Sequence, residues 1–442
     1  MNLKYLIIYF TFTLILYLVV SINYLQELNN LDIYITNLTF VFIYYISLLS
    51  ITYSSRIQNY KVISLVVLAF GLIYISIYNY LYFNYTGTFF EFTGSDSTFY
   101  HFHSQISKQY SYFQGIENYV ERTRFGYDDS GMIAYLSLLY RIIDHPLFPR
   151  FVNVFIHLLT VFFTYKISKN FISKENSIIV SLIYGLASYS LFYVSSGLKE
   201  PIFNLFVVIS FYSYLQFYKT RKIYHVLFLT LFSSIIVLFR LPVAIFVLSS
   251  IFLTEFLFRK FSIKKLLIVF MLIALSIYLY ITYIDLITMY VGLRNPNLND
   301  TEYLPGLFEN MLIIFSGFFG PLPTILPISG HENDSLWAPS LILKMYLSIY
   351  FVYGIFIILK NKNPFLFSIV LMCLLNIISL IIVKNTFKVR YIMPYLPLFF
   401  IIVGYSFEKI KNERAFNMLR LSVLPVNIAL TVIILGWNLM RL

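Results

Sequence analysis

Long apolar runs constrain the fold of this chain more than any other feature of its sequence. Each run is long enough to cross the hydrocarbon core of a bilayer as a helix, which takes about 17 to 25 residues. There are thirteen such runs, at residues 5–22, 34–53, 62–83, 150–166, 177–195, 201–218, 223–239, 241–258, 266–284, 340–359, 364–383, 390–407 and 421–440. The sequence therefore predicts an all-α polytopic membrane protein with about 13 transmembrane helices.

The composition agrees with this class. Of the 442 residues, 59% are hydrophobic and only 12% are charged, whereas about a quarter of a soluble domain is charged. The first run, 5–22, lacks a small-residue cleavage site, so we expect it to remain as the first helix. The single cysteine, Cys373, lies inside an apolar run, which excludes a disulfide framework or a cysteine-based metal site within one chain.

The distribution of charge predicts the orientation. The net charge of +12 comes from basic residues scattered over short connections, a pattern that does not favour nucleic acid as a partner. With a cytoplasmic N-terminus, the cytoplasmic segments hold 19 basic and four acidic residues, and the opposite face holds 12 basic and 16 acidic ones. The excess of basic residues inside is the usual arrangement in multi-pass proteins.

Two extracytoplasmic segments, 84–149 and 285–339, are too long to be mere connectors, and long connections are usually functional or disordered. In the second, residues 306–326 are apolar but contain Gly317, Gly320, Pro321 and Pro323. We interpret them as a re-entrant or interfacial piece rather than a further span. The expected organisation is an N-terminal helix pair (1–61), a transmembrane core with both loops (62–407), and a C-terminal cytoplasmic loop with the last helix (408–442).

The first long loop contains the candidate catalytic residue, Asp96. It follows Thr93, Gly94 and Ser95, which favour a turn. It precedes Tyr100 on what we expect to be a short helix. A loop carboxylate is by default only solvated, but a carboxylate beside the bilayer also suits a general base.

Further candidates for substrate binding lie in the same loop. They are Tyr100, His101, His103, Asp128 and Asp129. The two histidines are two residues apart and lack the spacing of a zinc pair, so we expect packing or a hydrogen bond to substrate. The neighbouring aromatic residues are expected to pack at the membrane interface.

Charged residues also mark the extracytoplasmic ends of several runs: Lys199, Glu200, Arg240, Lys384, Lys388 and Arg390. Any one basic residue at a membrane boundary usually extends to the lipid headgroups. Five on one face, opposite an acidic loop, favour a site for a lipid phosphate, because guanidinium and ammonium groups donate charge-assisted hydrogen bonds to its oxygens. A base opposite such cations predicts transfer of a group from a lipid phosphate or diphosphate to a hydroxyl.

Several motifs, in this order, resemble those of the bacterial GT-C superfamily of glycosyltransferases, which includes relatives of the protein mannosyltransferases and of the lipid A aminoarabinose transferase. They are Asp96 before Tyr100, PRFVNVF with Arg150 and Asn153, SGLKEP, and RYIMPYLP. The resemblance covers about residues 62 to 407. It implies a GT-C-like helix bundle in the bacterial cytoplasmic membrane, a polyprenyl-phosphate sugar donor, an extracytoplasmic active site, and Asp96 as base. The acceptor would be a glycan, a lipid or a protein.

Two departures and two alternatives remain. Two spans precede the loop-bearing unit, where many relatives have one. No Asp-x-Asp signature occurs, which argues against the metal-dependent oligosaccharyltransferase branch, so we expect no cofactor, although Asp128 and Asp129 leave a divalent cation open. A polysaccharide polymerase or ligase using a diphosphate-linked glycan would use the same cations. A flippase for lipid-linked oligosaccharides, or another transporter, would favour charges at mid-span and internal repeats.

Overall fold

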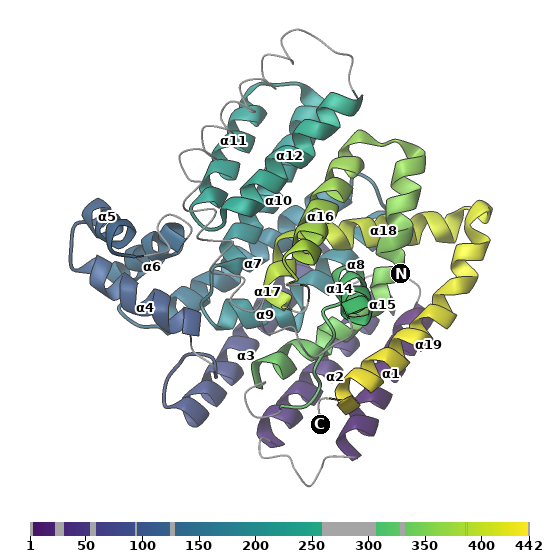
Figure 1. The fold of residues 1–442 in the computed structure, drawn as a ribbon, viewed down its shortest axis with the longest axis horizontal. Coiled ribbons are helices and arrows are strands. Elements are labelled where there is room, and N and C mark those ends of the chain that lie inside the picture. The colour runs from purple at the N-terminus through teal and green to yellow at the C-terminus, as the bar shows by residue number, and fades with distance from the viewer. Residues whose placement is uncertain are drawn as a thin grey trace.

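Every regular element in the described part of the chain is a helix. The computed structural model describes residues 3–22, 31–53, 59–92, 95–123, 129–258, 306–327, 332–384, 386 and 388–440. No strand occurs among them. Figure 1 shows the helices as one bundle with a smaller group of helices at one side.

The helices in chain order are α1 (Leu3–Ile22), α2 (Leu31–Tyr53), α3 (Tyr60–Thr86), α4 (Ser95–Lys108), α5 (Tyr112–Arg122), α6 (Ser130–Ile142), α7 (Leu147–Ser168), α8 (Lys174–Gly185), α9 (Ser188–Ser195), α10 (Glu200–Thr220), α11 (Tyr224–Val237), α12 (Leu241–Phe258), α14 (Gly306–Phe318), α15 (Glu332–Asn361), α16 (Pro364–Ile382), α17 (Val389–Ile392), α18 (Leu396–Asn412) and α19 (Asn417–Met440). Two short 3-10 turns, Met393–Tyr395 and Arg414–Phe416, precede α18 and α19.

Length and composition make this a multi-pass membrane protein. Among the described residues, ten helices are long and apolar enough to cross a membrane, or up to eleven if the bent pair α8 and α9 forms one span. The tenfold repetition of such helices confirms the predicted class. The apolar helix α11 is shorter than the expected span. The expected span at 266–284 lies outside the described residues.

Helices α15 and α18 form the centre of the bundle. They pack against each other, and α15 also contacts α1, α2, α9, α16 and α19. Every residue of α18 from Leu396 to Phe407 is buried. On peripheral helices such as α1 and α19, by contrast, large apolar side chains including Leu18 and Leu421 are exposed, as a lipid-facing surface requires.

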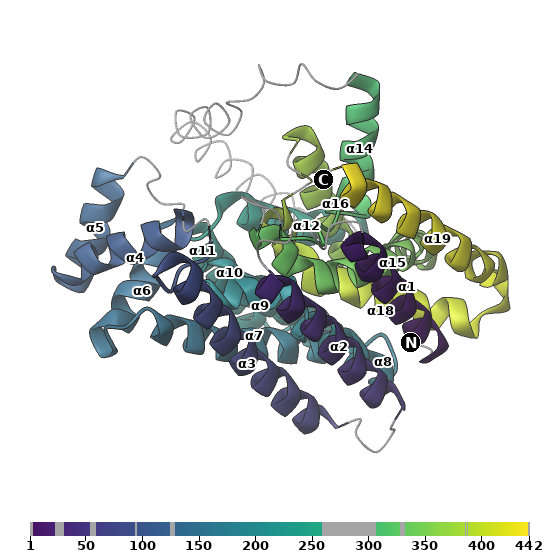
Figure 2. The same cartoon turned by 90° about the horizontal axis from the view of Figure 1, so that it is seen from below.

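Helices α4, α5 and α6 form a cap (residues 95–142) beside the bundle. They pack on one another, and α6 continues through a short connection into α7. Figures 1 and 2 both show the cap at one side of the molecule, next to α3 and the α7–α10 region. The cap accounts for most of the long segment predicted at 84–149.

The structure corrects one span and one loop boundary. The run predicted as a single helix at 177–195 is two helices, α8 and α9, bent by 48°. At the bend, the backbone N–H of Ser188 donates to Ser340 Oγ at 2.6 Å. A hydroxyl from α15 thus replaces a bond that a continuous helix would make within itself. The loop predicted to end at 339 is shorter, because α15 already begins at Glu332 and contains Pro339.

The sequence predicts that glycine and proline interrupt the apolar segment 306–326, and the structure has such an interruption. Helix α14 ends at Phe318, and residues 320–327 are non-helical and buried. Asn438 of α19 satisfies part of this backbone, because its side chain accepts from Ile325 N at 2.8 Å and donates to Pro323 O at 2.9 Å. Non-helical backbone at such depth requires partners of this kind.

Candidate functional site

Seven polar residues from five parts of the chain meet where the cap joins the bundle. We refer to them as the polar cluster: Asp96 and Tyr100 of α4, Asp129 before α6, Lys199 and Glu200 at the start of α10, Arg240 between α11 and α12, and Arg390 of α17. All seven were predicted from the sequence as candidate site residues. Ion pairs and hydrogen bonds link six of them, at positions up to 294 residues apart, and Arg240 lies against the ring of Tyr391 beside Arg390.

Arg390 joins three members of the cluster. Its Nη1 forms an ion pair with Asp96 Oδ2, and its Nε donates to Glu200 Oε1 at 2.5 Å. Its Nη2 donates to the Tyr100 hydroxyl at 3.3 Å. The guanidinium therefore uses its planar set of donors to hold the cap helix α4 against the start of α10.

Asp129 and Lys199 form a third ion pair. Asp129 Oδ1 also accepts from the Tyr100 hydroxyl at 2.9 Å. Lys199 Nζ donates further to the backbone oxygen of Phe239 at 2.7 Å. Tyr100 thus lies between Arg390 and Asp129, accepting from the guanidinium and donating to the carboxylate.

Local sequence explains how α4 and α10 present these groups. Asp96 and Tyr100 are four residues apart, so they share one face of α4. Asp96 and Glu200 both lie in the first turn of their helices, where the positive end of the helix dipole favours a carboxylate. Pro201 follows Glu200 in the first turn of α10, a position that needs no backbone donor.

Arg240 is held by an aromatic ring. Its side chain is buried, and its guanidinium carbon lies 4.6 Å from the centre of the Tyr391 ring. A guanidinium over a tyrosine face is a favourable cation–π arrangement. The charge of Arg240 also acts on Glu200, so this residue contributes to the electrostatics of the cluster.

The cluster is graded from solvent to interior and is balanced in charge. The Asp96 side chain is 42% exposed, Arg390 is 25% exposed and Glu200 is fully buried. In their ordinary ionisation states, the three carboxylates offset the three basic groups. Asp96 is therefore the carboxylate that a molecule arriving from solvent reaches most easily.

Four other predicted residues lie apart from the cluster. His101 Nδ1 is 2.9 Å from the Tyr140 hydroxyl, and burial lowers the pKa of the imidazole. The His103 ring lies between Phe99 and Tyr119, and burial lowers its pKa also. Both histidines therefore favour the neutral form and pack within the cap.

Lys384 and Lys388 are exposed on the chain leading to α17. Asp128 lies outside the described residues.

Two contributors were missed by the sequence reasoning. Tyr391 lies within the motif RYIMPYLP but was given no role, although its position next to Arg390 could have indicated one. Phe239 contributes a main-chain oxygen, for which side-chain chemistry gives no signal.

Among the described residues, no three histidine, cysteine, aspartate or glutamate side chains gather where they could hold a metal ion. The cluster instead offers basic groups for an anion and one accessible carboxylate for a proton. A comparison with protein-family models, with curated proteins and with solved structures found no match to this chain. The resemblance to GT-C glycosyltransferases therefore stays a prediction from the sequence motifs.

Proposed function

We propose that this chain is a membrane glycosyltransferase of the GT-C type, which transfers a sugar from a polyprenyl-phosphate donor to a hydroxyl on the extracytoplasmic face. The observation that supports it best is the direct pairing of Asp96 with Arg390 at the junction of cap and bundle. A carboxylate for the acceptor proton and a cation for the donor phosphate are then within reach of a single sugar phosphate. The proposal includes about 13 spans and an active site outside the cytoplasm.

The first step is an exchange of partners on Arg390. The donor carries a phosphodiester with one negative charge, and its phosphate oxygens suit the guanidinium donors that now serve Asp96. Donor binding moves Arg390 from the carboxylate to the phosphate. Glu200 stays on the other side of the guanidinium and keeps it oriented through the bond at 2.5 Å.

The second step is substitution at the anomeric carbon. The acceptor oxygen bonds to that carbon while the bond from carbon to phosphate oxygen breaks, and the hydroxyl proton passes to Asp96. The leaving polyprenyl phosphate then carries two negative charges, and Asp96 becomes neutral. Arg390, with Lys199 and Arg240 nearby, stabilises the charge that develops on the leaving phosphate.

The test is the Asp96→Asn variant, which keeps the size of the side chain and removes the proton acceptor. We expect it to insert and bind donor but to transfer sugar at least about a hundredfold more slowly, the low end of the contribution of a general base. Transfer is measured in membrane vesicles of the host from which the native copy has been deleted. The donors are short-chain polyprenyl-phosphate hexoses and pentoses, and the acceptors are those of the membrane.

The matched control is Asp144→Asn. Asp144 lies in the connection from α6 to α7, and its partners are Gln105 and Lys108 of the cap rather than the cluster. The Asp144→Asn protein should transfer sugar at nearly the normal rate. Normal transfer by the Asp96→Asn protein, or normal surface glycans in cells that carry only this variant, would exclude Asp96 as the base.

A further inference from the structure

Both tryptophans of the chain line one cavity beside the polar cluster. The sequence contains two tryptophans, and they lie 100 positions apart, Trp337 in α15 and Trp437 in α19. The cavity has a volume of about 40 Å³, and its lining includes Asp334 and Thr324. A concave site with aromatic walls and a few polar groups is the usual form of a small-molecule site.

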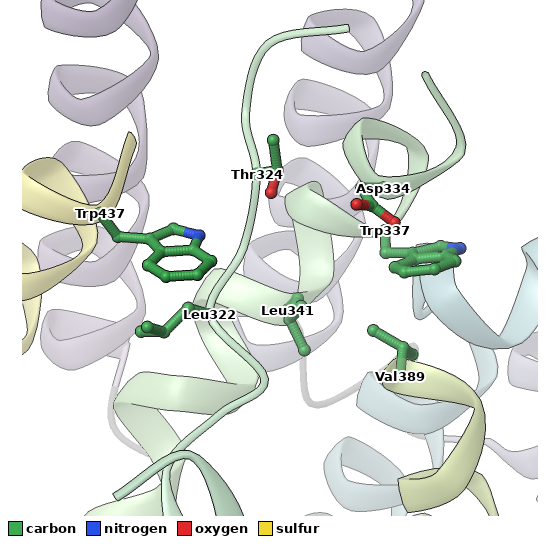
Figure 3. A pocket seen from close by; sticks show the side chains of 7 residues that line it. All are labelled: Leu322, Thr324, Asp334, Trp337, Leu341, Val389 and Trp437. Carbon is green, nitrogen blue, oxygen red and sulfur yellow. The ribbon is translucent and has the colours of Figure 1, made fainter. Parts of the chain in front are cut away.

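The side chains are sorted around the cavity by chemistry. Figure 3 shows the two indoles on opposite sides, Thr324 and Asp334 in the upper part of the view with Asp334 next to Trp337, and the apolar side chains in the lower part. Those apolar residues are Leu322, Leu341 and Val389. The described lining contains no lysine or arginine, so it is not suited to a phosphate.

This lining matches the two kinds of surface on a sugar. The C–H faces of a pyranose ring are apolar and pack on indole, while its hydroxyls need donors and acceptors at the edge. The Asp334 carboxylate supplies acceptors, and the Thr324 hydroxyl both donates and accepts. A polyprenyl chain would leave the carboxylate against hydrocarbon, which is unfavourable.

The cavity adjoins the place where the donor phosphate would bind. Val389 in its wall precedes Arg390 in the same short helix, α17. Trp337 in turn packs on Tyr193, with the ring centres 6.4 Å apart and the planes 18° from parallel. The charges of Glu200 and Asp334 both act on Tyr193.

We infer that this cavity binds the donor sugar, and that it selects an uncharged sugar over a uronic acid. The inference rests on the proposed function, since a sugar joined directly to a phosphate on Arg390 must lie within a few ångströms of it. A buried water needs roughly 10–15 Å³ of such volume, so about three waters fit. The cavity therefore receives one hydroxyl-bearing edge of the ring, and a carboxylate on that edge would face Asp334.

Intrinsic fluorescence tests this directly, because both tryptophans line the cavity. The full-length protein in lipid nanodiscs is excited where its 40 tyrosines absorb little. It is titrated with methyl glycosides of neutral hexoses, with a methyl hexuronide, and with a short polyprenol. We expect a saturable change with at least one neutral glycoside, and none with the hexuronide or the polyprenol.

Three variants locate the binding. Asp334→Asn should weaken glycoside binding by about tenfold or more, the effect of losing one charge-assisted hydrogen bond. Glu332→Gln removes a carboxylate from the same first turn of α15 without touching the cavity lining, and it should bind as the native protein does. Trp337→Phe should retain part of the signal through Trp437 and show weaker binding.

The inference is overturned if no glycoside gives a saturable change, if the polyprenol alone does so, or if Asp334→Asn and Glu332→Gln behave alike. It also fails, with the proposed function intact, if transfer depends on Asp96 while Asp334→Asn leaves rate and sugar preference unchanged. Conversely, Asp96→Asn should bind glycosides normally. Normal transfer by that variant beside specific glycoside binding would exclude Asp96 as the base and retain the sugar site.

Discussion

Glu91 shows how burial changes the behaviour of a carboxylate close to the site. It is buried, it accepts a hydrogen bond from the Ser97 hydroxyl, and Ser97 adjoins Asp96. Desolvation raises the pKa of the Glu91 carboxyl above its ordinary value of 4.5, with the Ser97 bond and the charge of Arg150 acting in the opposite direction. Glu91 therefore positions the first turn of α4 and is not a simple solvated loop residue.

This raised pKa predicts a pH dependence of stability. A group that binds its proton more tightly in the folded state contributes stability that is fully present below its unfolded pKa and lost as pH rises through its folded pKa. We expect Glu91→Gln to gain thermal stability relative to the native protein as pH rises above 4.5. The measurement is the unfolding temperature of both proteins from about pH 4 to about pH 8.

Asp144 supplies a control of opposite sign. Hydrogen bonds from Lys108 and Gln105 lower the pKa of the Asp144 carboxyl. Its stabilising effect is present above the unfolded pKa and is lost as pH falls. Asp144→Asn should therefore change stability only slightly, since the group is exposed, and in the reverse direction with pH. Parallel curves for native protein and Glu91→Gln would show that Glu91 keeps an ordinary pKa.

At this scale the sequence predicted which residues gather but not how they pair. Lys199, Arg240 and Arg390 stand at the ends of apolar runs, and charges there must reach a polar environment, so their convergence was predictable. Their pairing with Asp96, Asp129 and Glu200 was not, because the partners come from distant segments. Lys384 and Lys388 show the same local sequence pattern as Arg390 and yet are exposed. What distinguishes Arg390 is the packing of α17, which the local sequence does not reveal.

At the scale of elements, the cap and the bundle are in close backbone contact at Gly131. Gly131 follows Asp129 by two residues, and its backbone N–H donates to Leu238 O at 2.9 Å. A Cβ at this position would lie 2.9 Å from that oxygen and 2.9 Å from a ring carbon of Phe239. The absence of a side chain at Gly131 thus allows Asp129 and the Phe239 carbonyl to meet Lys199.

We expect Gly131→Ala to destabilise the protein by about 1–3 kcal/mol, the usual cost of overpacking. It should also reduce transfer, because α6 must move away from the α11–α12 connection. The matched control is Gly436→Ala in α19, where an added Cβ meets nothing within 4 Å. There alanine should be neutral or stabilise by up to about 1 kcal/mol through helix propensity. Equal unfolding temperatures for the two variants would contradict the close contact.

Helices were predicted well where an apolar run is long. They were predicted poorly where hydrogen bonds to distant segments set a bend or an end. Apolar length predicted most spans within a few residues. The bend between α8 and α9 depends on Ser188, whose hydroxyl is 2.7 Å from the Ser340 hydroxyl, and nothing local announces a partner 152 positions away. The early start of α15 was hidden by Pro339, which lies inside the helix and not before it.

At the scale of the whole molecule, the proposed orientation places the cap outside the cytoplasm. The single cysteine, Cys373, is buried, so Cys373→Ala gives a background for labelling. Phe102→Cys in the cap and Lys222→Cys between α10 and α11 replace exposed residues. A membrane-impermeant maleimide should label position 102 in intact cells and position 222 only after permeabilisation. The reverse labelling pattern would mean that the proposed orientation is inverted and that the polar cluster lies on the cytoplasmic side.

The ion pair between Asp96 and Arg390 also orders events during synthesis. Its two residues are 294 positions apart, and chains grow at about 5–20 residues per second, so Arg390 emerges roughly 15–60 s after Asp96. For that interval the cap helix exists without the cation that holds it. A nascent chain that ends before Arg390 therefore lacks one member of the polar cluster. The contact through which Arg390 joins the cap to the bundle is therefore completed only in the last part of translation.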